Sequence, residues 1–398
     1  MNILVINSGS SSIKFQLMAM PEARLICEGL VERIGQEEAV FHVKKEDETL
    51  QEVLRVTDHR AGLKKMAEFL LDPSIGVIAD TGDLAAVGHR VVHGGDRFST
   101  TTRITGKVKE EIRAFIPLAP LHNPHNLEGI EIAEEVFPDA VQVAVFDTAF
   151  HQSMPLTARK YAIPEYLFRD YGIKVYGFHG ISHKYVTERA LEYLNLSHSR
   201  IISIHLGNGC SMTAVQDGKS LDHSLGFAPG NGLIMGSRSG DIDHALIFYL
   251  TEHLGYATED IRRMLTRESG MLGLTGLSDM RDIQAKAEEG DASCRLALQM
   301  NAYRIRKYIG AYAAVLNGLD AIVFTAGIGE NSALIRKLAC EGMEYLGLEL
   351  DPERNTAPAK GICEIQAVSS RVRILIVPTN EELEIAREVF LLLNNGNK

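Results

Sequence analysis

The 398-residue sequence has no tryptophan and is poor in cysteine. Its five cysteines are scattered, odd in number and form no Cys-x-x-Cys pair, which excludes a disulfide framework and a zinc site built on cysteines and is typical of a reduced, cytoplasmic protein. No uncharged apolar run approaches the roughly 18 residues that a membrane helix needs. The N-terminus has neither a basic segment nor a cleavage site, so we expect no secretory signal and no membrane partner.

Basic residues are outnumbered, with 41 Lys+Arg against 52 Asp+Glu and a formal net charge of −11. This balance argues against general nucleic-acid binding, which needs a basic face. Two common nucleotide-binding loops are also missing, Gly-x-x-x-x-Gly-Lys-[Ser/Thr] and Gly-x-Gly-x-x-Gly before a helix, which disfavours a P-loop NTPase and a Rossmann oxidoreductase. What remains is a chain 45% apolar and 23% charged, long enough for two or three domains of about 100–200 residues.

Apolar runs bounded by polar turns alternate with segments of helical periodicity, which predicts an α/β fold. Strands are predicted at residues 3–6, 13–18, 24–31, 85–92, 140–146, 201–206, 212–215, 321–325 and 373–377. Helices are predicted at residues 107–115, 126–136, 183–194, 244–254, 261–266, 283–289, 293–316 and 381–393. The tail, residues 394–398, is expected to be frayed.

A strand, a polar turn and a second strand occur once in each half of the chain. Gly9 in the first turn aligns with Gly209 in the second, and Ser11 aligns with Ser211, all at an offset of 200. Chance similarity is the alternative, since Gly/Ser turns between strands are common. The pattern predicts two similar α/β halves facing each other.

Four polar turns contain glycine, and we expect each to follow an apolar strand: residues 7–12, 207–211, 236–240 and 327–331. Glycine lets backbone approach closely and lets consecutive N–H groups converge on one anion. Any one of them alone is best interpreted as a plain tight turn. Together they favour a site for the polyphosphate of a nucleotide.

Cationic side chains lie beside these turns. Arg90 ends a strand between two histidines, Arg238 lies between small residues, and His179 is flanked by glycines. A guanidinium matches the geometry of carboxylate and phosphate. We interpret these three as ligands of an anion in a cleft, with surface salt bridges and structural histidines as the alternatives.

Oxygen ligands follow the same pattern. Asp147 ends a buried strand, Glu381 follows a strand and a turn, and Asn7 opens the first turn. Mg²⁺ bound to ATP needs only one or two protein ligands. The sequence therefore predicts a sparse magnesium site, although Glu381 alone fits a helix cap equally well.

Eight segments, in this order, resemble the acetate kinase family, and the likeness runs from residue 3 to about residue 390. They are residues 7–15, 88–95, 145–151, 176–183, 205–209, 236–243, 327–331 and 378–382. The resemblance implies the actin/hexokinase/Hsp70-like fold, two duplicated α/β domains with a cleft between them. It implies an N-terminal domain over residues 1–149, with a helix of about residues 383–398 packing back on it, and a nucleotide-binding domain over residues 150–382.

The resemblance also implies the reaction: reversible, Mg²⁺-dependent, direct in-line transfer of the γ-phosphoryl group of ATP to acetate, giving acetyl phosphate and ADP. Mn²⁺ is an alternative metal, and a homodimer is common in such kinases. The carboxylate of acetate is ionised at pH 7, with a pKa of roughly 4–5, so the reaction needs no general base. A propionate kinase and, from another class, a non-enzymatic nucleotide switch of the actin or Hsp70 type remain as alternatives.

Residues that match the family's motifs take four implied roles. The catalytic set is Arg90, Asp147, His179 and Arg238, and the metal set is Asn7 and Glu381, with Asp147 positioning Mg²⁺. The nucleotide set is Lys14, His205, Leu206, Gly207, Asn208, Gly209, Asp279, Met280, Arg281, Gly327, Ile328, Gly329, Glu330 and Asn331. The acyl-substrate set is Arg90, Val92, Leu121, His122 and Pro229. Gly230-Asn231 replaces the family's usual Leu-Glu directly after Pro229, so we expect the wall of the acyl pocket to differ here.

Overall fold

The computed structural model describes residues 1–398 except 10, 46–47, 359 and 396–398. The chain folds into two compact units, each built on one β-sheet with helices packed on it. Unit 1 comprises Met1–Ala149 and Asn380–Lys398, and unit 2 comprises Phe150–Thr379. None of the helices in the described ranges has the length and apolar character of a membrane span.

The sheet of unit 1 has the strand order β5-β4-β3-β2-β1-β6-β8-β7. Its strands are β1 (Asn2–Ser8), β2 (Ser12–Ala19), β3 (Arg24–Glu32), β4 (Ala39–Lys45), β5 (Glu48–Leu54), β6 (Leu84–Val91), β7 (Thr102–Arg103) and β8 (Val141–Phe146). The first five strands form an antiparallel meander, whereas β1, β6 and β8 run parallel. The apolar runs of β1 and β8 are almost wholly buried, as expected of strands covered on both faces.

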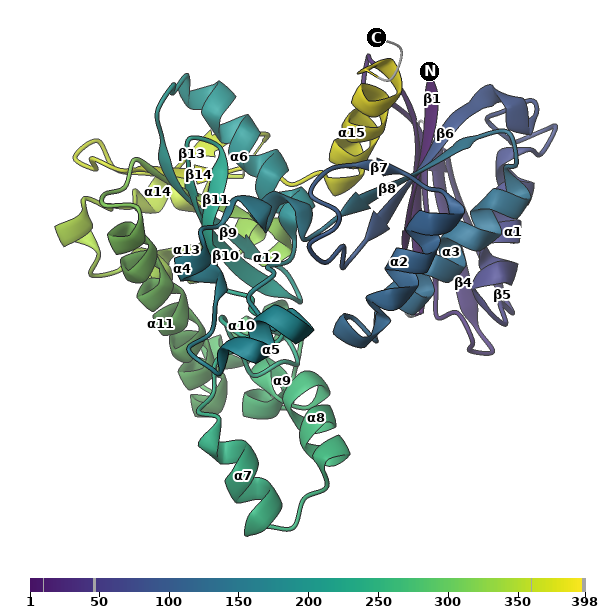
Figure 1. Cartoon of the computed structure of the whole chain (residues 1–398). Coiled ribbons are helices and arrows are strands. Elements are labelled where there is room, and N and C mark those ends of the chain that lie inside the picture. The colour runs from purple at the N-terminus through teal and green to yellow at the C-terminus, as the bar shows by residue number, and fades with distance from the viewer. Residues whose placement is uncertain (10, 46–47, 359, 396–398) are drawn as a thin grey trace. The chain divides into compact units, whose positions relative to one another are not determined.

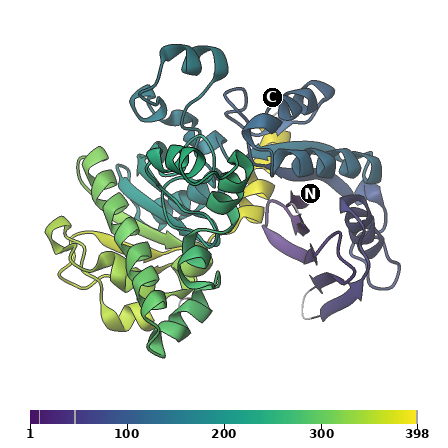
Figure 2. The same cartoon turned by 90° about the horizontal axis from the view of Figure 1, so that it is seen from below.

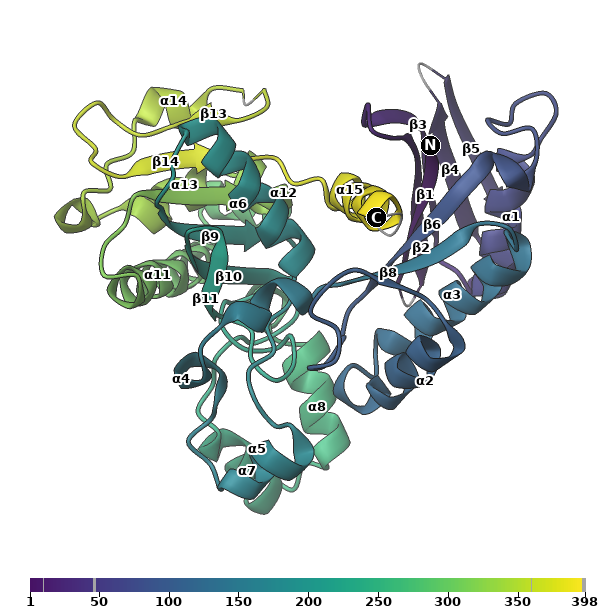
Figure 3. The same cartoon turned by 45° about the horizontal axis from the view of Figure 1, so that its top comes forward.

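Helices cover both faces of this sheet. They are α1 (His59–Leu70), α2 (Gly106–Ala114), α3 (Asn123–Val136) and α15 (Glu381–Asn395). The first three lie on one face and α15 on the other (Figures 1 and 3). A Cβ on Gly88 of β6 would lie 2.8 Å from Ile385 and 2.9 Å from Val389, so glycine allows α15 to pack closely. The first strand and the last helix of the chain therefore lie side by side (Figure 2).

The sheet of unit 2 has the order β11-β10-β9-β12-β14-β13. Its strands are β9 (Arg200–Leu206), β10 (Cys210–Gln216), β11 (Lys219–His223), β12 (Ala321–Thr325), β13 (Cys363–Glu364) and β14 (Arg373–Ile376). Its helices are α4 (Leu156–Arg159), α5 (Glu165–Tyr171), α6 (Gly180–Leu194), α7 (Ala245–Glu252), α8 (Thr258–Arg267), α9 (Gly270–Thr275), α10 (Met280–Glu288), α11 (Ala292–Val315), α12 (Ala326–Asn331), α13 (Ala333–Cys340) and α14 (Pro352–Thr356). Of these, α6 covers one face of the sheet and α11 the other (Figure 3).

The predicted duplication is confirmed in the order and direction of the strands. The order β3-β2-β1-β6-β8 in unit 1 matches β11-β10-β9-β12-β14 in unit 2, with a hairpin followed by two parallel strands in each. The predicted residue alignment is wrong. The N–H of Gly9 donates to the Ser12 carbonyl at 2.8 Å, whereas in the second turn Gly207 donates to Gly209 at 3.0 Å. Gly207 therefore corresponds to Gly9, and Ser211 lies inside β10.

Three further expectations are corrected. Residues 327–331 are not a turn but part of α12, because the chain continues as a helix directly after β12. Residues 236–240 follow a loop and not a strand. Residues 394–395 belong to α15, while the rest of the predicted frayed tail lies outside the described residues.

Candidate active site

In unit 1, the carboxyl ends of three parallel strands gather predicted site residues at one edge of the sheet. Arg90 of β6 donates from Nε and Nη2 to the two carboxylate oxygens of Asp147, directly after β8, at 3.1 and 2.6 Å. Its Nη1 donates to Oδ1 of Asn7 of β1 at 3.4 Å. Glu381, the first residue of α15, places a carboxylate oxygen 3.8 Å from Arg90 Nε. Arg90 is thus the centre of a cluster of oxygen ligands.

Burial and charge decide the ionisation of this cluster. Burial opposes the charge on Arg90, but Asp147 and Glu381 outweigh it and raise the pKa of the guanidinium. Burial also raises the pKa of Glu381, and Arg90 offsets this only in part. A second cation beside Glu381 would therefore stabilise its ionised carboxylate. One amide and two carboxylate oxygens suit Mg²⁺ or Mn²⁺, so Asn7, Asp147 and Glu381 fit the predicted metal.

Two buried asparagines, which the sequence analysis did not single out, hold these strand ends. Asn126 Nδ2 donates to the Ser8 carbonyl at 2.9 Å, and its Oδ1 accepts the N–H of Val92 at 3.1 Å. Asn123 Oδ1 accepts the N–H of His93 at 3.1 Å, and its Nδ2 donates to the His93 carbonyl at 3.0 Å. The Asn-Pro dipeptide at the start of α3 predicts a helix boundary. It does not reveal that the two asparagine side chains point into the unit.

The other predicted residues of unit 1 have mixed surroundings. Lys14 pairs with Glu382 at 2.7 Å and is half exposed. Val92 is buried, whereas Leu121 is 47% exposed. His122 stands directly before α3. Among the residues of this unit that were predicted to line the acyl pocket, Val92 therefore has the side chain most enclosed by its neighbours.

In unit 2, the fold brings His179, Gly209 and Arg238 together. A Cβ on Gly209 would lie 3.3 Å from His179 Cε1 and 4.0 Å from Arg238 Nη1, so glycine lets both side chains approach the turn. His179 has a left-handed backbone, with φ of 56°, directly before α6. Arg238 Nη1 donates to the Pro229 carbonyl at 2.8 Å, and burial lowers the pKa of its guanidinium. These residues place a ring nitrogen and a cation beside one backbone turn.

His179 is supported by Ser211, Ser203 and His183, which were not among the predicted site residues, and by His205, which was. Ser211 Oγ lies 2.9 Å from His179 Nδ1 and 2.7 Å from His183 Nε2, and His183 Nδ1 lies 2.8 Å from Ser203 Oγ. Burial lowers the pKa of His183 well below its ordinary value, so that ring is neutral. The His205 ring stacks on His179 with centroids 4.5 Å apart. Ser211 thus holds the His179 ring in one orientation.

Two more buried histidines clamp the residue before His179. The N–H of Phe178 donates to His223 Nε2 at 3.1 Å, and His151 Nε2 donates to the Phe178 carbonyl at 3.0 Å. Burial lowers the pKa of His151 to about 4 and that of His223 well below its ordinary value. Single residues at such distances in sequence carry no pattern that could have revealed this cluster.

Unit 2 also contains a cavity of about 780 Å³, which suits a nucleotide-sized ligand. Eight residues of the predicted nucleotide set line it: Gly207, Asn208, Asp279, Met280, Arg281, Gly327, Ile328 and Asn331. Polar residues that were not predicted line it as well: Ser278, Gln284, Asn301 and Ser332. A Cβ on Gly236 would come within 2.0 Å of Asn208 Oδ1, so any larger residue there would displace the Asn208 side chain from this point of the wall.

Five residues of the predicted nucleotide set do not line this cavity, although they belong to unit 2: His205, Leu206, Gly209, Gly329 and Glu330. Glu330 Oε1 accepts the N–H of Thr379 at 3.1 Å. Buried Arg336, which was not predicted, donates from Nη1 to the carbonyls of Gly329 and Glu330, each at 2.9 Å. It thereby satisfies carbonyls at the end of α12 and fixes the segment that lines the cavity.

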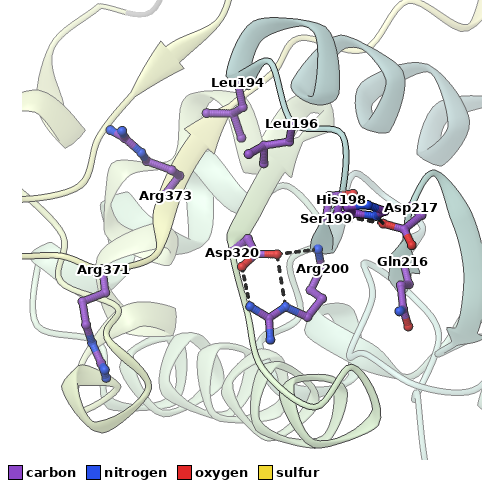
Figure 4. Close-up of a pocket in the computed structure, with 10 residues that line it drawn as sticks. All are labelled: Leu194, Leu196, His198, Ser199, Arg200, Gln216, Asp217, Asp320, Arg371 and Arg373. Carbon is purple, nitrogen blue, oxygen red and sulfur yellow. Dashed lines mark hydrogen bonds and ion pairs between the residues drawn. The ribbon is translucent and has the colours of Figure 1, made fainter.

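A different pocket of unit 2 lies at the amino ends of its parallel strands (Figure 4). Arg200, at the start of β9, donates from Nη2 and Nε to the two carboxylate oxygens of Asp320 at 2.6 and 3.1 Å. Ligands of open α/β sheets bind at the carboxyl ends of the strands, and this pocket lies at the opposite ends. We therefore assign the cavity beside Gly207 as the candidate nucleotide site.

Comparisons with known proteins cover almost the whole chain. The profile of the Acetokinase family matches residues 2–387. The chain is 58% identical over 395 residues to an acetate kinase of Flavobacterium johnsoniae, covering 99% of this chain and 100% of that protein. The crystal structure of Porphyromonas gingivalis acetate kinase superposes with a TM-score of 0.93 at 40% identity, covering 98% and 99% of the two chains. A propionate kinase structure from Francisella tularensis gives a TM-score of 0.92 at 41% identity, covering 97% and 98%.

Proposed function

The chain belongs to the acetokinase family, and we propose that it transfers the γ-phosphoryl group of ATP reversibly to acetate, giving acetyl phosphate and ADP. The observation that carries this proposal is the turn at residues 207–209. Its first two residues line a nucleotide-sized cavity, and its last residue, Gly209, leaves room for the side chains of His179 and Arg238 beside the turn. A ring N–H donor and a cation next to bound phosphates are what phosphoryl transfer needs.

The chain's own charges meet the main difficulty of the reaction, which is repulsion between two anions. The acceptor is already ionised and needs no base. We propose that Arg90 holds its carboxylate, while Arg238 and His179 stabilise the charge on the transferring phosphoryl oxygens. Because Asp147 and Asn7 already hold the Arg90 fork, the guanidinium is oriented before the acceptor binds.

Asn7 and Glu381, with Asp147, would hold Mg²⁺, or Mn²⁺ in its place. When bound, the metal neutralises charge on the phosphate oxygens. We propose that the thirteen nucleotide-set residues of unit 2 form the ATP site, eight as its lining and the rest as its support, and that Lys14 of unit 1 serves the phosphates. Chelation should therefore abolish turnover while the fold remains intact.

Acetate is the proposed acceptor, and propionate is the second candidate. The relative from F. johnsoniae is named an acetate kinase at 58% identity, while the F. tularensis structure is named a propionate kinase at 41%. We propose that Val92, Leu121, His122 and Pro229 shape the acyl site. Buried Val92 leaves little room to expand, which favours the shorter acid.

The test is formation of an acyl phosphate, trapped with hydroxylamine as a hydroxamate. We expect purified protein with Mg–ATP to give hydroxamate with acetate, less with propionate and least with butyrate. A preference for propionate would change the acceptor and leave the kinase proposal standing. No acid-dependent hydroxamate, with ATP binding retained, would support the nucleotide-switch alternative.

We propose further that the protein acts as a homodimer in the cytoplasm. Helix α7 lies at the end of unit 2 away from its sheet (Figures 1 and 3) and exposes an apolar surface. Its exposed residues are Leu246, Ile247, Phe248 and Tyr249, with Leu254 and Tyr256 just beyond the helix. These consecutive residues point to all sides of the helix, and so many large apolar side chains exposed together are typical of a protein interface. Light scattering should give twice the 43.8 kDa of the chain, and Phe248→Glu should give monomers.

A further inference from the structure

Unit 1 holds a cluster of two histidines and a glutamate that the proposed reaction does not use. His59 is the first residue of α1, and His125 and Glu128 lie one turn apart on α3. The two helices pack side by side (Figures 1 and 3). One ligand atom from each of the three side chains falls within 4.8 Å of the others. The cluster therefore joins two helices through three potential metal ligands.

The hydrogen bond of His59 settles which nitrogen is free. His59 Nε2 lies 2.6 Å from the Gly9 carbonyl, which can only accept, so Nε2 carries the hydrogen. In the neutral ring, Nδ1 then has its lone pair and points toward Glu128, 3.8 Å away. A metal-binding histidine usually donates its other ring N–H to a backbone carbonyl in this way. His59 therefore has the tautomer and the support of a metal ligand.

His125 supplies a second nitrogen. Its Nδ1 is buried, lies 3.9 Å from the same Glu128 oxygen and has no hydrogen-bond partner among the residues that the structure describes. A buried ring nitrogen without a partner is costly. The two imidazole rings are nearly parallel, with centroids 5.0 Å apart, so both Nδ1 atoms face the same carboxylate. The distances of 3.8 and 3.9 Å exceed hydrogen bonds, so these atoms are gathered without bonding to one another.

We propose that His59 Nδ1, His125 Nδ1 and a Glu128 oxygen form a binding site for a divalent transition-metal ion, with Zn²⁺ as the best fit. Two imidazoles and one carboxylate form a common zinc ligand set, with water in the fourth position. Tetrahedral coordination at about 2.1 Å places ligand atoms about 3.4 Å apart, so the site closes by about 1 Å when metal binds. Glu128, 45% exposed, has the freedom to make that movement.

Metal at this site would tie α1 to α3 and, through the Nε2–H of His59, fix the Gly9 carbonyl. Gly9 lies two residues after Asn7, in the first turn of the chain. The site is distinct from the cluster around Arg90 because it uses none of its side chains. Its occupancy would therefore stiffen the first turn without adding a charge to the phosphate site.

The test is Zn²⁺ affinity of the full chain, measured by competition with a chromophoric chelator in excess Mg²⁺, without nucleotide. We expect one tight equivalent and a higher melting temperature. His125→Ala and Glu128→Gln should each weaken binding by at least about tenfold. The matched control is His198→Ala, which removes a 90% exposed histidine that lies 3.6 Å from Asp217, and it should bind as the unaltered chain does.

Two outcomes would overturn the site: an affinity that neither variant changes, or less than one equivalent of Zn²⁺. A measurement without variants covers the case in which one of them misfolds. In ¹H–¹⁵N spectra of the unaltered chain, Zn²⁺ should shift the Nδ1 signals of two imidazoles at one equivalent. Co²⁺ should give a visible spectrum without thiolate charge transfer, and a thiolate band would assign the metal to a cysteine instead.

Discussion

The two units share a strand order but hold their site residues by different forces. In unit 1, Arg90 is fixed by the charges of Asp147 and Glu381. In unit 2, His179 is fixed by Ser211 and by neutral, buried histidine rings. Two sheets with the same strand order can therefore hold their site residues by a dense set of charges in one unit and by a network of neutral hydrogen bonds in the other. The two constructions should fail under different perturbations.

The largest expected difference is between Arg90→Ala and Arg238→Ala. Both should lower kcat/KM by at least about tenfold, since a preorganised charge contact is lost. Only Arg90→Ala should also lower the free energy of unfolding strongly, by about 3–5 kcal/mol, because Asp147 is 1% exposed and loses its counter-ion. Arg238 donates to a backbone carbonyl, and its loss strands no buried carboxylate there. Urea unfolding and steady-state kinetics of both variants measure the two effects.

The control adds Asp147→Asn to Arg90→Ala. The double variant should regain much of the unfolding free energy while activity stays low, because the unpaired charge is gone but the guanidinium is still missing. Equal stability losses in the two single variants would show that the charge cluster of unit 1 is not what distinguishes it. Normal kinetics in either variant would remove that arginine from the proposed site.

Acid should separate the units next. Burial lowers the pKa of three histidines in unit 2, with His151 at about 4, and of two in unit 1, His89, also to about 4, and His125. Below pH 6.5 the unfolded chain binds protons that the folded rings refuse, so stability falls as pH falls. By pH 5, each ring with a pKa of about 4 lowers the free energy of unfolding by about 2 kcal/mol. Two buried carboxyl groups with raised pKa values act in the opposite direction and stabilise the folded chain as the pH falls: Asp222 in unit 2, at about 6, and Glu381 in unit 1, at about 7.

Amide hydrogen exchange at pH 7 and pH 5, corrected for intrinsic rates, measures this difference. Peptides from β9, β10 and α6 should lose more protection than peptides from β1, β6 and β8. An equal loss in both sheets would mean that the histidine cluster does not set the acid stability of unit 2. Protection that rises on acidification would reverse the sign and contradict the assignment of neutral rings.

The sequence predicted most strands and helices because each had an apolar period of its own. It also grouped His179 with Arg238 as ligands of one anion, since both are flanked by small residues that leave a side chain accessible in a cleft. What it could not predict are contacts between residues far apart in the chain. Ser211 contacts His183, and Asn126 bonds to Ser8, only because the sheet and α3 bring them together. Neither pair has a spacing that a sequence pattern could show.

The errors have equally local causes. The offset of 200 aligned Gly9 with Gly209, but Gly9 is the first residue of its turn and Gly209 is the last residue of the second turn, so Gly207 is the counterpart of Gly9. Residues 327–331 are rich in glycine and were expected to form a turn. They form the helix α12 instead, because Arg336 donates to a carbonyl at the end of this helix. Tertiary hydrogen bonds thus outweighed the low helix propensity of glycine.

A smaller effect should show whether the neutral network matters for catalysis. Ser211→Ala and Ser203→Ala each remove one hydroxyl partner of His183, but only Ser211 also touches His179. We expect Ser211→Ala to lower kcat by about tenfold with little change in the KM for ATP, because His179 loses its orientation. Ser203→Ala should keep kcat within about twofold. Equal kcat losses would mean that the network supports folding alone.

The smallest expected effect concerns the acyl pocket and tests whether unit 1 also sets specificity. Val92 is buried and Leu121 is 47% exposed, so trimming the first opens enclosed space and trimming the second does not. Val92→Ala should raise kcat/KM for propionate relative to acetate by a few-fold, since one methylene is worth only about 10–200-fold even in a good apolar pocket. The Gly230-Asn231 replacement directly after Pro229 keeps the expected change at the low end, because we expect the wall of the acyl pocket to differ there. Leu121→Ala, as the matched control, should leave the ratio unchanged. An unchanged ratio in Val92→Ala as well would show that Val92 does not line the acyl pocket.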